Sequence, residues 1–370
     1  MILKQIPEDF IVEEIPIFDK LLDKGKYLIF SLEKKNFDTE KVIQILSKIF
    51  KIQRKFFNYA GSKDRKAITK QYCSLKIIEN KKIKDFEKYY KESYFKIKVL
   101  GYLNEPLSLG SLKGNKFTIT LRDLSEKDEH GFFNHIKNRT NEKIIKEQIE
   151  FVNYFDEQRF SKNNYEIGYS LIKKDFKKAT DLIDLIEVKL HLDKNKKDYV
   201  GALKKVPFKI LTMYINSVQS YLFNEVCAEY IKKKAKNYFE IDYVLSEADE
   251  KKIKKFFFCN EKIKNIEIPL ISFDTDLSNL NNDKKINNEL KKIYESVLNR
   301  EKIYLNDFVI RQFPELTVLG SKRNLIATAK DFEIISFEND ELNKNKKKIK
   351  ISFFLDKGSY ATVFVKFLSL

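Results

Sequence analysis

Residues 59–71 read YAGSKDRKAITKQ. This stretch places a single carboxylate, Asp64, among four cations directly before a predicted strand. Nearby positive charge favours the ionised form of a carboxylate, and a turn that contains Gly61 can present it in a cleft. Solvated loops show the same pattern, because exposed ion pairs are common and weak. The stretch alone therefore leaves two interpretations of Asp64, a reactive carboxylate and a surface ion pair.

Short strands and a helix are predicted around this stretch. Residues 27–32 (YLIFSL) are typical of a buried strand, and residues 71–78 carry apolar side chains at alternate positions. Between them, apolar residues recur at helical spacing over residues 42–50, after Asp38 and Thr39, either of which can cap the start of a helix. Residues 116–122 (KFTITLR) alternate again and predict another strand. The first part of the chain is therefore expected to contain a sheet.

The middle and the end of the chain differ in texture. Residues 161–316 contain longer charged helical stretches, of which residues 216–232 are the clearest. At the end, residues 351–355 and 361–367 are predicted to be strands joined by a hairpin at residues 356–359. The pattern predicts an α+β fold in which a sheet domain is interrupted by a mainly helical insertion.

The composition fits a folded protein that binds a polyanion. The chain has 370 residues, 43% of them hydrophobic, and a formal net charge of +17. A basic surface attracts nucleic acid, although lysine-rich stretches can also be ordinary solvated surface. No stretch approaches the roughly 20 apolar residues of a membrane span, so a cytoplasmic protein is expected. Three widely spaced cysteines and three histidines show no metal-ligand spacing and no disulfide framework.

The arginines carry more information than the lysines. Only eight of the 71 basic residues are arginine, in a chain that uses lysine almost everywhere. Arginine presents a planar fork that pairs bidentately with phosphate or carboxylate, which lysine does not reproduce. Four of the eight lie in or beside the segments discussed below, namely Arg65, Arg122, Arg159 and Arg323.

Residues 61–71 resemble the G-x-K-D-x-x-A-x-T-x-Q signature of the TruD family of tRNA pseudouridine synthases, which is present in full. Further segments resemble the same family in the same order along the chain. They are PEDF (7–10), LKGNKF (112–117), NYFDEQRF (153–160), QSYLFN (219–224) and KGSYAT (357–362). The resemblance therefore covers nearly the whole chain.

The resemblance implies a fold and a reaction. It implies a pseudouridine synthase mixed-sheet domain at residues 1–161 and 317–370, interrupted by the family's inserted domain at residues 162–316. It also implies isomerisation of uridine to pseudouridine in tRNA, at position 13, without a cofactor or a metal. Asp64 matches the family's catalytic aspartate, as a nucleophile at C1′ or as a base at C2′.

The resemblance also implies a set of substrate-binding residues. Phe117 matches the active-site aromatic, with Phe10 and Tyr360 as further stacking or contact positions, although each could instead be plain core. Asn115 matches a contact to the uracil edge, for which its amide offers a donor and an acceptor. Lys4 resembles the active-site cation and could pair with Asp64. RNA binding or structural support is assigned to Lys63, Arg65, Arg159 and Arg323.

The chain departs from the family pattern at two positions, and an alternative function stays open. Asp156 and Ser161 stand where many members have glycine, which concerns the local loop path. A catalytically inactive tRNA-binding or RNA-folding protein on the same fold is the alternative function. No protein partner is implied, and a monomer is expected because no heptad stretch or large apolar patch is evident.

Overall fold

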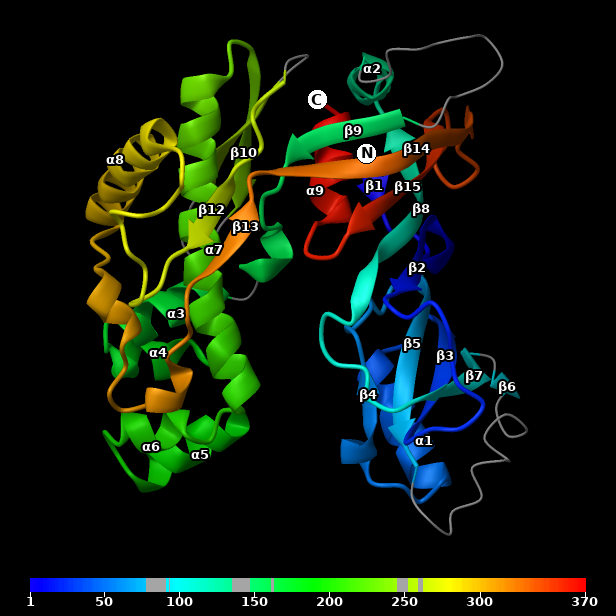
Figure 1. Cartoon of the computed structure of the whole chain (residues 1–370), viewed down its shortest axis with the longest axis horizontal. Coiled ribbons are helices and arrows are strands. Elements are labelled where there is room, and N and C mark those ends of the chain that lie inside the picture. Colours follow the sequence, from blue (N-terminus) through cyan, green and yellow to red (C-terminus); the bar gives the residue numbers. More distant parts are fainter. Residues whose placement is uncertain (78–90, 93, 135–146, 161–162, 245–251, 259–261) are drawn as a thin grey trace. The chain divides into compact units, whose positions relative to one another are not determined.

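The computed structural model describes residues 1–77, 91–92, 94–134, 147–160, 163–244, 252–258 and 262–370 (Figure 1). The chain folds into two compact units. The first contains residues 1–150, 328–361 and 368–370, and the second contains residues 151–327 and 362–367. The predicted domain boundary at residues 161 and 162 lies outside the described residues, so the domain limits of the sequence analysis stay a prediction.

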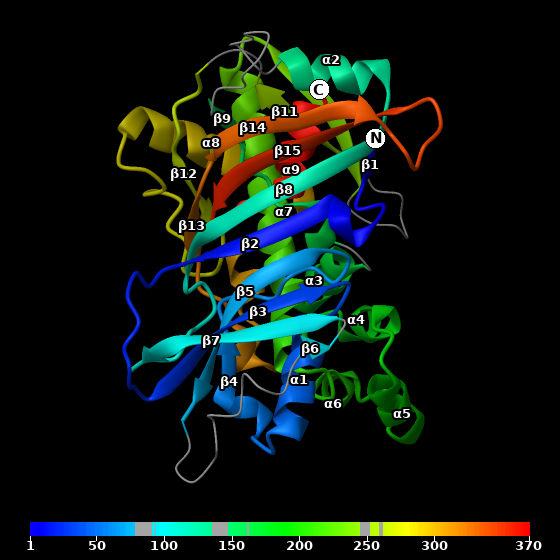
Figure 2. The ribbon, with the colours of Figure 1, turned by 90° about the vertical axis from the view of Figure 1, so that its right-hand side faces the viewer.

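A long mixed sheet organises the first unit, and its neighbouring strands run side by side in Figure 2. The strand order is β6-β7-β3-β5-β2-β8-β15-β14-β9, with β1 added beside β8 and β4 beside β5. The pair β2 and β5 is parallel, whereas β8 is antiparallel to both β2 and β15. The strands are β1 (Ile2–Leu3), β2 (Phe10–Pro16), β3 (Tyr27–Lys35), β4 (Phe57–Tyr59), β5 (Ile68–Lys76), β6 (Lys91–Glu92), β7 (Phe95–Leu103), β8 (Leu112–Leu124), β9 (Glu147–Val152), β14 (Ile326–Asn339) and β15 (Lys347–Asp356).

Helix α1 (Thr39–Ile49) covers the end of the sheet formed by β3, β5 and β7. Of the two predicted capping residues, Asp38 is the N-cap, and its side chain accepts a hydrogen bond from the Lys41 amide at 3.1 Å. Its buried side chains, Val42, Ile43 and Leu46, pack with apolar residues of these strands. The predicted strands at residues 27–32 and 116–122 and the predicted helix are confirmed, as is the described part of the strand at 71–78.

The second unit is built around one long helix, α7 (Phe208–Lys234). It contains the predicted helix at residues 216–232, and Val218, Leu222 and Val226 are fully buried. The other helices are α3 (Asn164–Ile172), α4 (Phe176–Leu182), α5 (Ile186–Lys194), α6 (Tyr199–Leu203) and α8 (Lys284–Glu301). Two antiparallel pairs, β10 (Tyr238–Val244) with β11 (Lys252–Phe258) and β12 (Glu267–Leu270) with β13 (Ser321–Asn324), complete the unit. The α+β fold class is confirmed. No described helix is long and apolar enough to cross a membrane.

The prediction for the end of the chain is half wrong. Residues 351–355 lie in β15, but residues 361–367 form helix α9 (Ala361–Leu368). Its Val363, Phe364 and Val365 are all buried, so apolar side chains occupy consecutive positions, and a short apolar run does not distinguish a strand from a buried helix. The predicted hairpin is therefore a strand-to-helix connection, in which Gly358 adopts the left-handed backbone conformation with φ of 89°.

Candidate active site

The loop that carries Asp64 joins β4 to β5 and is tied down by main-chain hydrogen bonds at both ends. The Ala60 carbonyl accepts from the Gly110 amide at 2.8 Å, and the Ala67 carbonyl accepts from the Asn36 amide at 3.0 Å. Ala67 is completely buried, so a larger side chain there would displace the loop. This explains why the signature contains alanine at this position.

The strand register places the signature residues on one face of the sheet. Val12 pairs with Thr69 on one side and with Phe117 on the other, and Thr69 also pairs with Lys34. Directly paired residues of neighbouring strands project to the same face. Glu14 lies two residues after Val12 in β2, and Asn115 lies two residues before Phe117 in β8. Glu14 and Asn115 pair with each other, so they project to this same face. We call this the catalytic face.

The buried side chain of Lys34 binds the backbone of the loop. Its side chain is only 2% exposed, and its Nζ donates to the main-chain carbonyl of Asp64 at 2.7 Å and to that of Lys63 at 3.3 Å. Burial lowers the pKa of Lys34 to about 8, although the Asp64 and Asp38 carboxylates act in the opposite direction. The position of the Asp64 backbone therefore depends on a buried cation.

A buried ion pair fixes the neighbouring signature residue. Lys63 Nζ lies 2.5 Å from Glu14 Oε2, and Glu14 is only 1% exposed. The other carboxylate oxygen of Glu14 accepts from the Tyr72 amide at 3.2 Å. The Lys63 side chain is thus withdrawn from solvent, whereas the side chain of the next residue, Asp64, is 42% exposed. The geometry favours structural support over RNA contact for Lys63.

The last signature residue, Gln71, links the loop to helix α1. Its Nε2 donates to the Gly61 carbonyl at 3.2 Å, and its Oε1 accepts from the Thr39 hydroxyl at 2.9 Å. Both side chains are fully buried. The signature is therefore a set of contacts that shape the loop around one outward-facing carboxylate.

Asp64 has an accessible side chain paired with a cation from the N-terminus. Its side chain is 42% exposed, and its Oδ2 lies 2.7 Å from Lys4 Nζ. The same Lys4 Nζ lies 3.9 Å from the centre of the Phe10 ring. The other oxygen, Oδ1, has no hydrogen bond to any residue that the structure describes. The structure thus brings Lys4, Phe10 and Asp64 together.

Beside this group lies an aromatic row on the catalytic face. The Phe10 and Phe117 rings meet edge to face with their centres 6.0 Å apart, and Phe117 stacks on Phe353 with the ring centres 5.4 Å apart. Phe117 is 8% exposed, so it is a packed residue as well as a candidate stacking surface. Asn115 Oδ1 is buried without a hydrogen-bond partner among the described residues. Tyr360 is half-buried in the connection after β15, whose Leu355 pairs with Asn115.

The three arginines assigned to RNA binding or support are in different surroundings. Arg65 is exposed next to Asp64. In the second unit, Arg159 Nε donates to the Ser220 hydroxyl at 3.2 Å, and Arg323 Nη2 donates to Asn153 Oδ1 at 2.6 Å. Arg323 also stacks on a phenylalanine ring. These contacts favour structural support for Arg159 and Arg323, whereas Arg65 is available to a ligand.

Asp156, one of the two departures from the family pattern, has a structural role. Its Oδ2 accepts from the Thr362 hydroxyl at 2.7 Å, and both residues belong to the second unit. Its φ is −82°, a conformation that needs no glycine. Ser161, the other departure, lies outside the described residues.

Sequence reasoning missed Lys34 and Glu14 as parts of this site. Each continues an apolar alternation, Lys34 after Phe30 and Leu32, and Glu14 after Phe10 and Val12. A charge at a position that should be buried is the signal that could have identified both, because buried charges need specific partners.

A family model described as tRNA pseudouridine synthase D (TruD) matches residues 1–187 and 187–367. The chain belongs to the TruD family. Its relatives include probable tRNA pseudouridine synthase D 2 of Methanocaldococcus jannaschii, which is 30% identical over 99% of this chain and 91% of the relative. Probable tRNA pseudouridine synthase D 1 of Methanococcus maripaludis is 29% identical over 99% of this chain and 98% of the relative.

The TruD fold is also shared with a solved structure. A crystal structure of the putative tRNA pseudouridine synthase D (TruD) from Methanosarcina mazei matches with a TM-score of 0.65 at 23% identity, and the match covers 99% of this chain and 93% of that chain. Membership of the TruD family therefore agrees with the sheet topology and with the resemblance found in the sequence.

Proposed function

We propose that this protein isomerises uridine 13 of tRNA to pseudouridine, with Asp64 as the catalytic carboxylate and without a cofactor. The observation that carries the proposal is the construction of the Asp64 loop. Three buried contacts hold the loop in place, and the side chain that they leave accessible is a carboxylate with one oxygen free of described partners. Membership of the TruD family supports the reaction class.

The reaction breaks the bond between C1′ and N1, turns the uracil over, and forms a bond between C1′ and C5. N1 gains a proton and C5 loses one, so the isomerisation involves no net redox change. Asp64 Oδ1 would either attack C1′ and form an ester that C5 later displaces, or remove the C2′ proton. In both routes Lys4 stabilises the carboxylate before the reaction and orients it through Oδ2.

The catalytic face offers groups that fit a uracil. A base extruded from tRNA loses its stacking partners, and the aromatic row of Phe10 and Phe117 provides a replacement beside Asp64, with Tyr360 as a further contact. The buried Asn115 Oδ1 lacks a partner among the described residues, and an N–H of uracil would supply one. The proposal therefore assigns stacking to the aromatics and edge recognition to Asn115.

The proposal includes the remaining expectations from the sequence. The catalytic domain comprises residues 1–161 and 317–370, and the inserted domain comprises residues 162–316. The protein works in the cytoplasm as a monomer, because its substrate is tRNA and no protein partner is implied. The inactive tRNA-binding alternative has no observation in its favour and is separated from the enzyme by the experiment below.

Activity and target position are tested together. Purified protein is incubated with tRNA transcripts that contain uridine at position 13, and pseudouridines are mapped by carbodiimide modification and primer extension. The expected result is one new pseudouridine, at position 13. A pseudouridine at another position would overturn the target assignment, and unmodified tRNA that nevertheless binds the protein would favour the inactive alternative.

A further inference from the structure

The N-terminal turn that carries Lys4 has an unfavourable backbone conformation. Lys4 has φ of 60°, in the left-handed region that non-glycine residues seldom adopt. A residue so close to a chain terminus is ordinarily mobile. Strained residues persist where the surrounding structure fixes them, and they gather at functional sites. We therefore expect the contacts that hold this turn to serve the function of the site.

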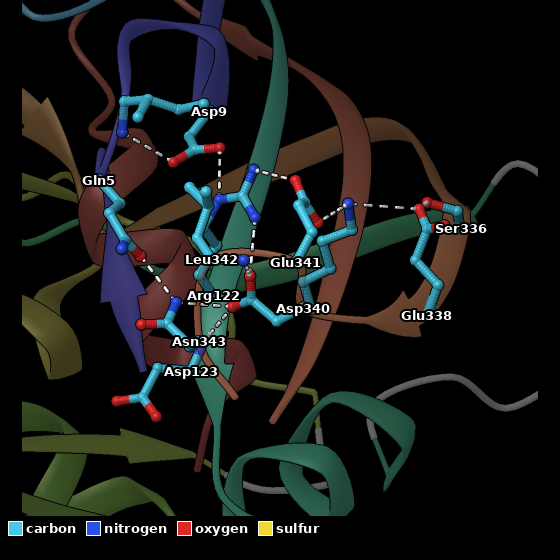
Figure 3. A network of polar contacts seen from close by, with 12 residues as sticks. Gln5, Asp9, Arg122, Asp123, Ser336, Glu338, Asp340, Glu341, Leu342 and Asn343 are labelled. Atoms are coloured by element: carbon cyan, nitrogen blue, oxygen red, sulfur yellow. Dashed lines mark hydrogen bonds and ion pairs between the residues drawn. The ribbon is translucent and has the colours of Figure 1, made fainter. Parts of the chain in front are cut away.

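Arg122 holds both ends of the turn. Before Lys4, strand β1 pairs Ile2 with the backbone of Arg122 in β8. After Lys4, the Arg122 side chain donates through Nε to Asp9 Oδ1 at 2.8 Å, and Asp9 Oδ2 accepts from the Ile6 amide at 3.0 Å. Figure 3 shows the guanidinium between Asp9 and the loop that contains Asp340. One buried arginine thus fixes the chain on either side of the active-site lysine.

The loop after β14 completes the network (Figure 3). Asp340 Oδ1 accepts from Arg122 Nη1 at 2.8 Å, and Asp340 Oδ2 accepts from Asn343 Nδ2 at 2.8 Å. Asn343 Nδ2 also donates to Gln5 Oε1 at 2.8 Å. Burial opposes ionisation of Asp340, but hydrogen bonds from Asn343, from two main-chain amides and from Arg122 lower its pKa to about 2. The ion pair between Asp340 and Arg122 is therefore charged at neutral pH.

We propose that Arg122, Asp9, Asp340 and Asn343 are positioning residues that hold the Lys4 ammonium against Asp64. None of them touches the reacting atoms, and their effect on the reaction passes through Lys4. The inference rests on the proposed function of Asp64. It explains why an arginine stands at position 122, because a lysine could not reach Asp9, Asp340 and Glu341 from one planar group.

A double-mutant cycle with Lys4 tests the proposal. Asn343→Ala cuts the link to Gln5 at the edge of the network, and Arg122→Lys removes the fork. Each variant is expected to lower kcat for tritium release from C5-labelled tRNA by about tenfold with little change in KM, since Lys4 acts on the carboxylate and not on tRNA affinity. In a Lys4→Met background, neither change should lower kcat further.

The controls separate positioning from general stability. Lys344→Ala alters an exposed neighbour in the same loop and should leave kcat unchanged. Should Arg122→Lys fail to fold, Asn343→Ala still decides the matter. Full kcat in Asn343→Ala, or a further loss in the Lys4→Met background, would overturn the proposal. An inactive wild-type protein would instead refute the proposed function.

A second, independent observation concerns the use of arginine. Among the seven arginines that the structure describes, five are bound to groups of the protein, whereas Arg65 and Arg311 are exposed and have no described partner. Arg65 lies beside Asp64. Arg311 lies in the second unit, where it lines a pocket of about 400 Å³ together with Lys174, Asn306, Val309 and Gln312.

The pocket is positively charged because its acidic neighbour is neutralised. The carboxylate of Asp307 lies 2.5 Å from Lys173 Nζ. Lys174 Nζ donates to the Asp307 main-chain carbonyl at 2.7 Å, which uses one of its three N–H groups. Arg311 and Lys174 therefore face the pocket without a carboxylate between them. A planar guanidinium, an ammonium and two amides suit a phosphodiester with its ribose.

We infer that this pocket binds a backbone phosphate of tRNA, an inference that rests on the proposed substrate. Arg311→Ala and Arg311→Lys are compared with Lys196→Ala, an exposed cation of the same unit, by gel-shift titration of a tRNA transcript. Both Arg311 variants should weaken binding about threefold to tenfold, and Arg311→Ala should lower the salt slope by about one. Wild-type affinity in Arg311→Ala would refute the site, whether or not the protein is active.

Discussion

At the scale of single residues, Lys34 makes the Asp64 loop sensitive to pH. Its pKa of about 8 lies below the ordinary lysine value, so the ammonium that donates to the Asp64 carbonyl is lost as pH rises through about 8. In the unfolded chain Lys34 keeps its proton at this pH, so the free energy of unfolding rises as the pH rises above about 8. The hydrogen bond to the Asp64 carbonyl becomes weaker over the same range. Activity and stability should therefore change in opposite directions.

This gives a prediction for the pH profile. Wild-type kcat should fall above about pH 8, whereas Lys34→Gln, which keeps a donor without a charge, should be slower at neutral pH and flat through this range. Tritium release measured between about pH 6.5 and 9.5 checks it. An identical alkaline fall in both proteins would assign the pH dependence to another group.

Phe117 is either a stacking partner of the target base or a core residue, and a substitution can distinguish the two roles. Phe117→Leu keeps most of the buried volume against Phe10 and Phe353 but removes the aromatic face. Stacking on a base is worth about 1 to 3 kcal/mol, so turnover should fall by roughly tenfold to a hundredfold. Circular dichroism should show a folded protein. Unchanged turnover with a lowered Tm would make Phe117 a core residue only.

At the scale of elements, the contact between β2 and the Asp64 loop is expected to stabilise the fold. Glu14→Gln leaves Lys63 buried without a counter-charge, which should lower the free energy of unfolding by about 3 to 5 kcal/mol. Glu13→Gln is the matched control, because the neighbouring Glu13 is 42% exposed in its pair with Lys70 and should cost less than about 1 kcal/mol. Urea denaturation measures both, and equal effects would contradict the role of the buried pair.

The elements also show how far the sequence could predict this site. A continuous apolar run identified β3, which is buried on both faces, and alternation identified β8. Helical spacing identified α1, which buries one face against the sheet. The signature located the Asp64 loop. Helix α9 was missed because it is buried on nearly every side, which removes the period. The partners of Lys34 and Arg122 could not be predicted, since they depend on residues as distant in sequence as Asp64 and Asp340.

At the scale of the whole molecule, the net charge of +17 predicts how tRNA binding depends on salt. A protein that neutralises several phosphates releases their counterions, so affinity should fall by about a hundredfold or more between about 50 and 200 mM salt. Gel-shift titrations at several salt concentrations measure the slope. A nearly flat dependence would mean that the lysine excess is ordinary solvated surface.

Asp64 is proposed as the catalytic carboxylate, and the variant that isolates this role is Asp64→Asn. The amide keeps the size of the side chain, but it neither attacks C1′ nor accepts the C2′ proton. Removal of a negative charge that faces RNA should leave tRNA binding intact or tighter. Asp331→Asn, a change at an exposed aspartate of the same unit, is the matched control.

The measurement is tritium release from C5-labelled uridine in tRNA, with a gel-shift titration of each protein. Wild type and Asp331→Asn should release tritium fully, whereas an Asp64→Asn protein that still binds tRNA should show no detectable release. Near-normal release by a folded Asp64→Asn protein, with deamidation excluded by mass spectrometry, would rule out Asp64 as the catalytic carboxylate.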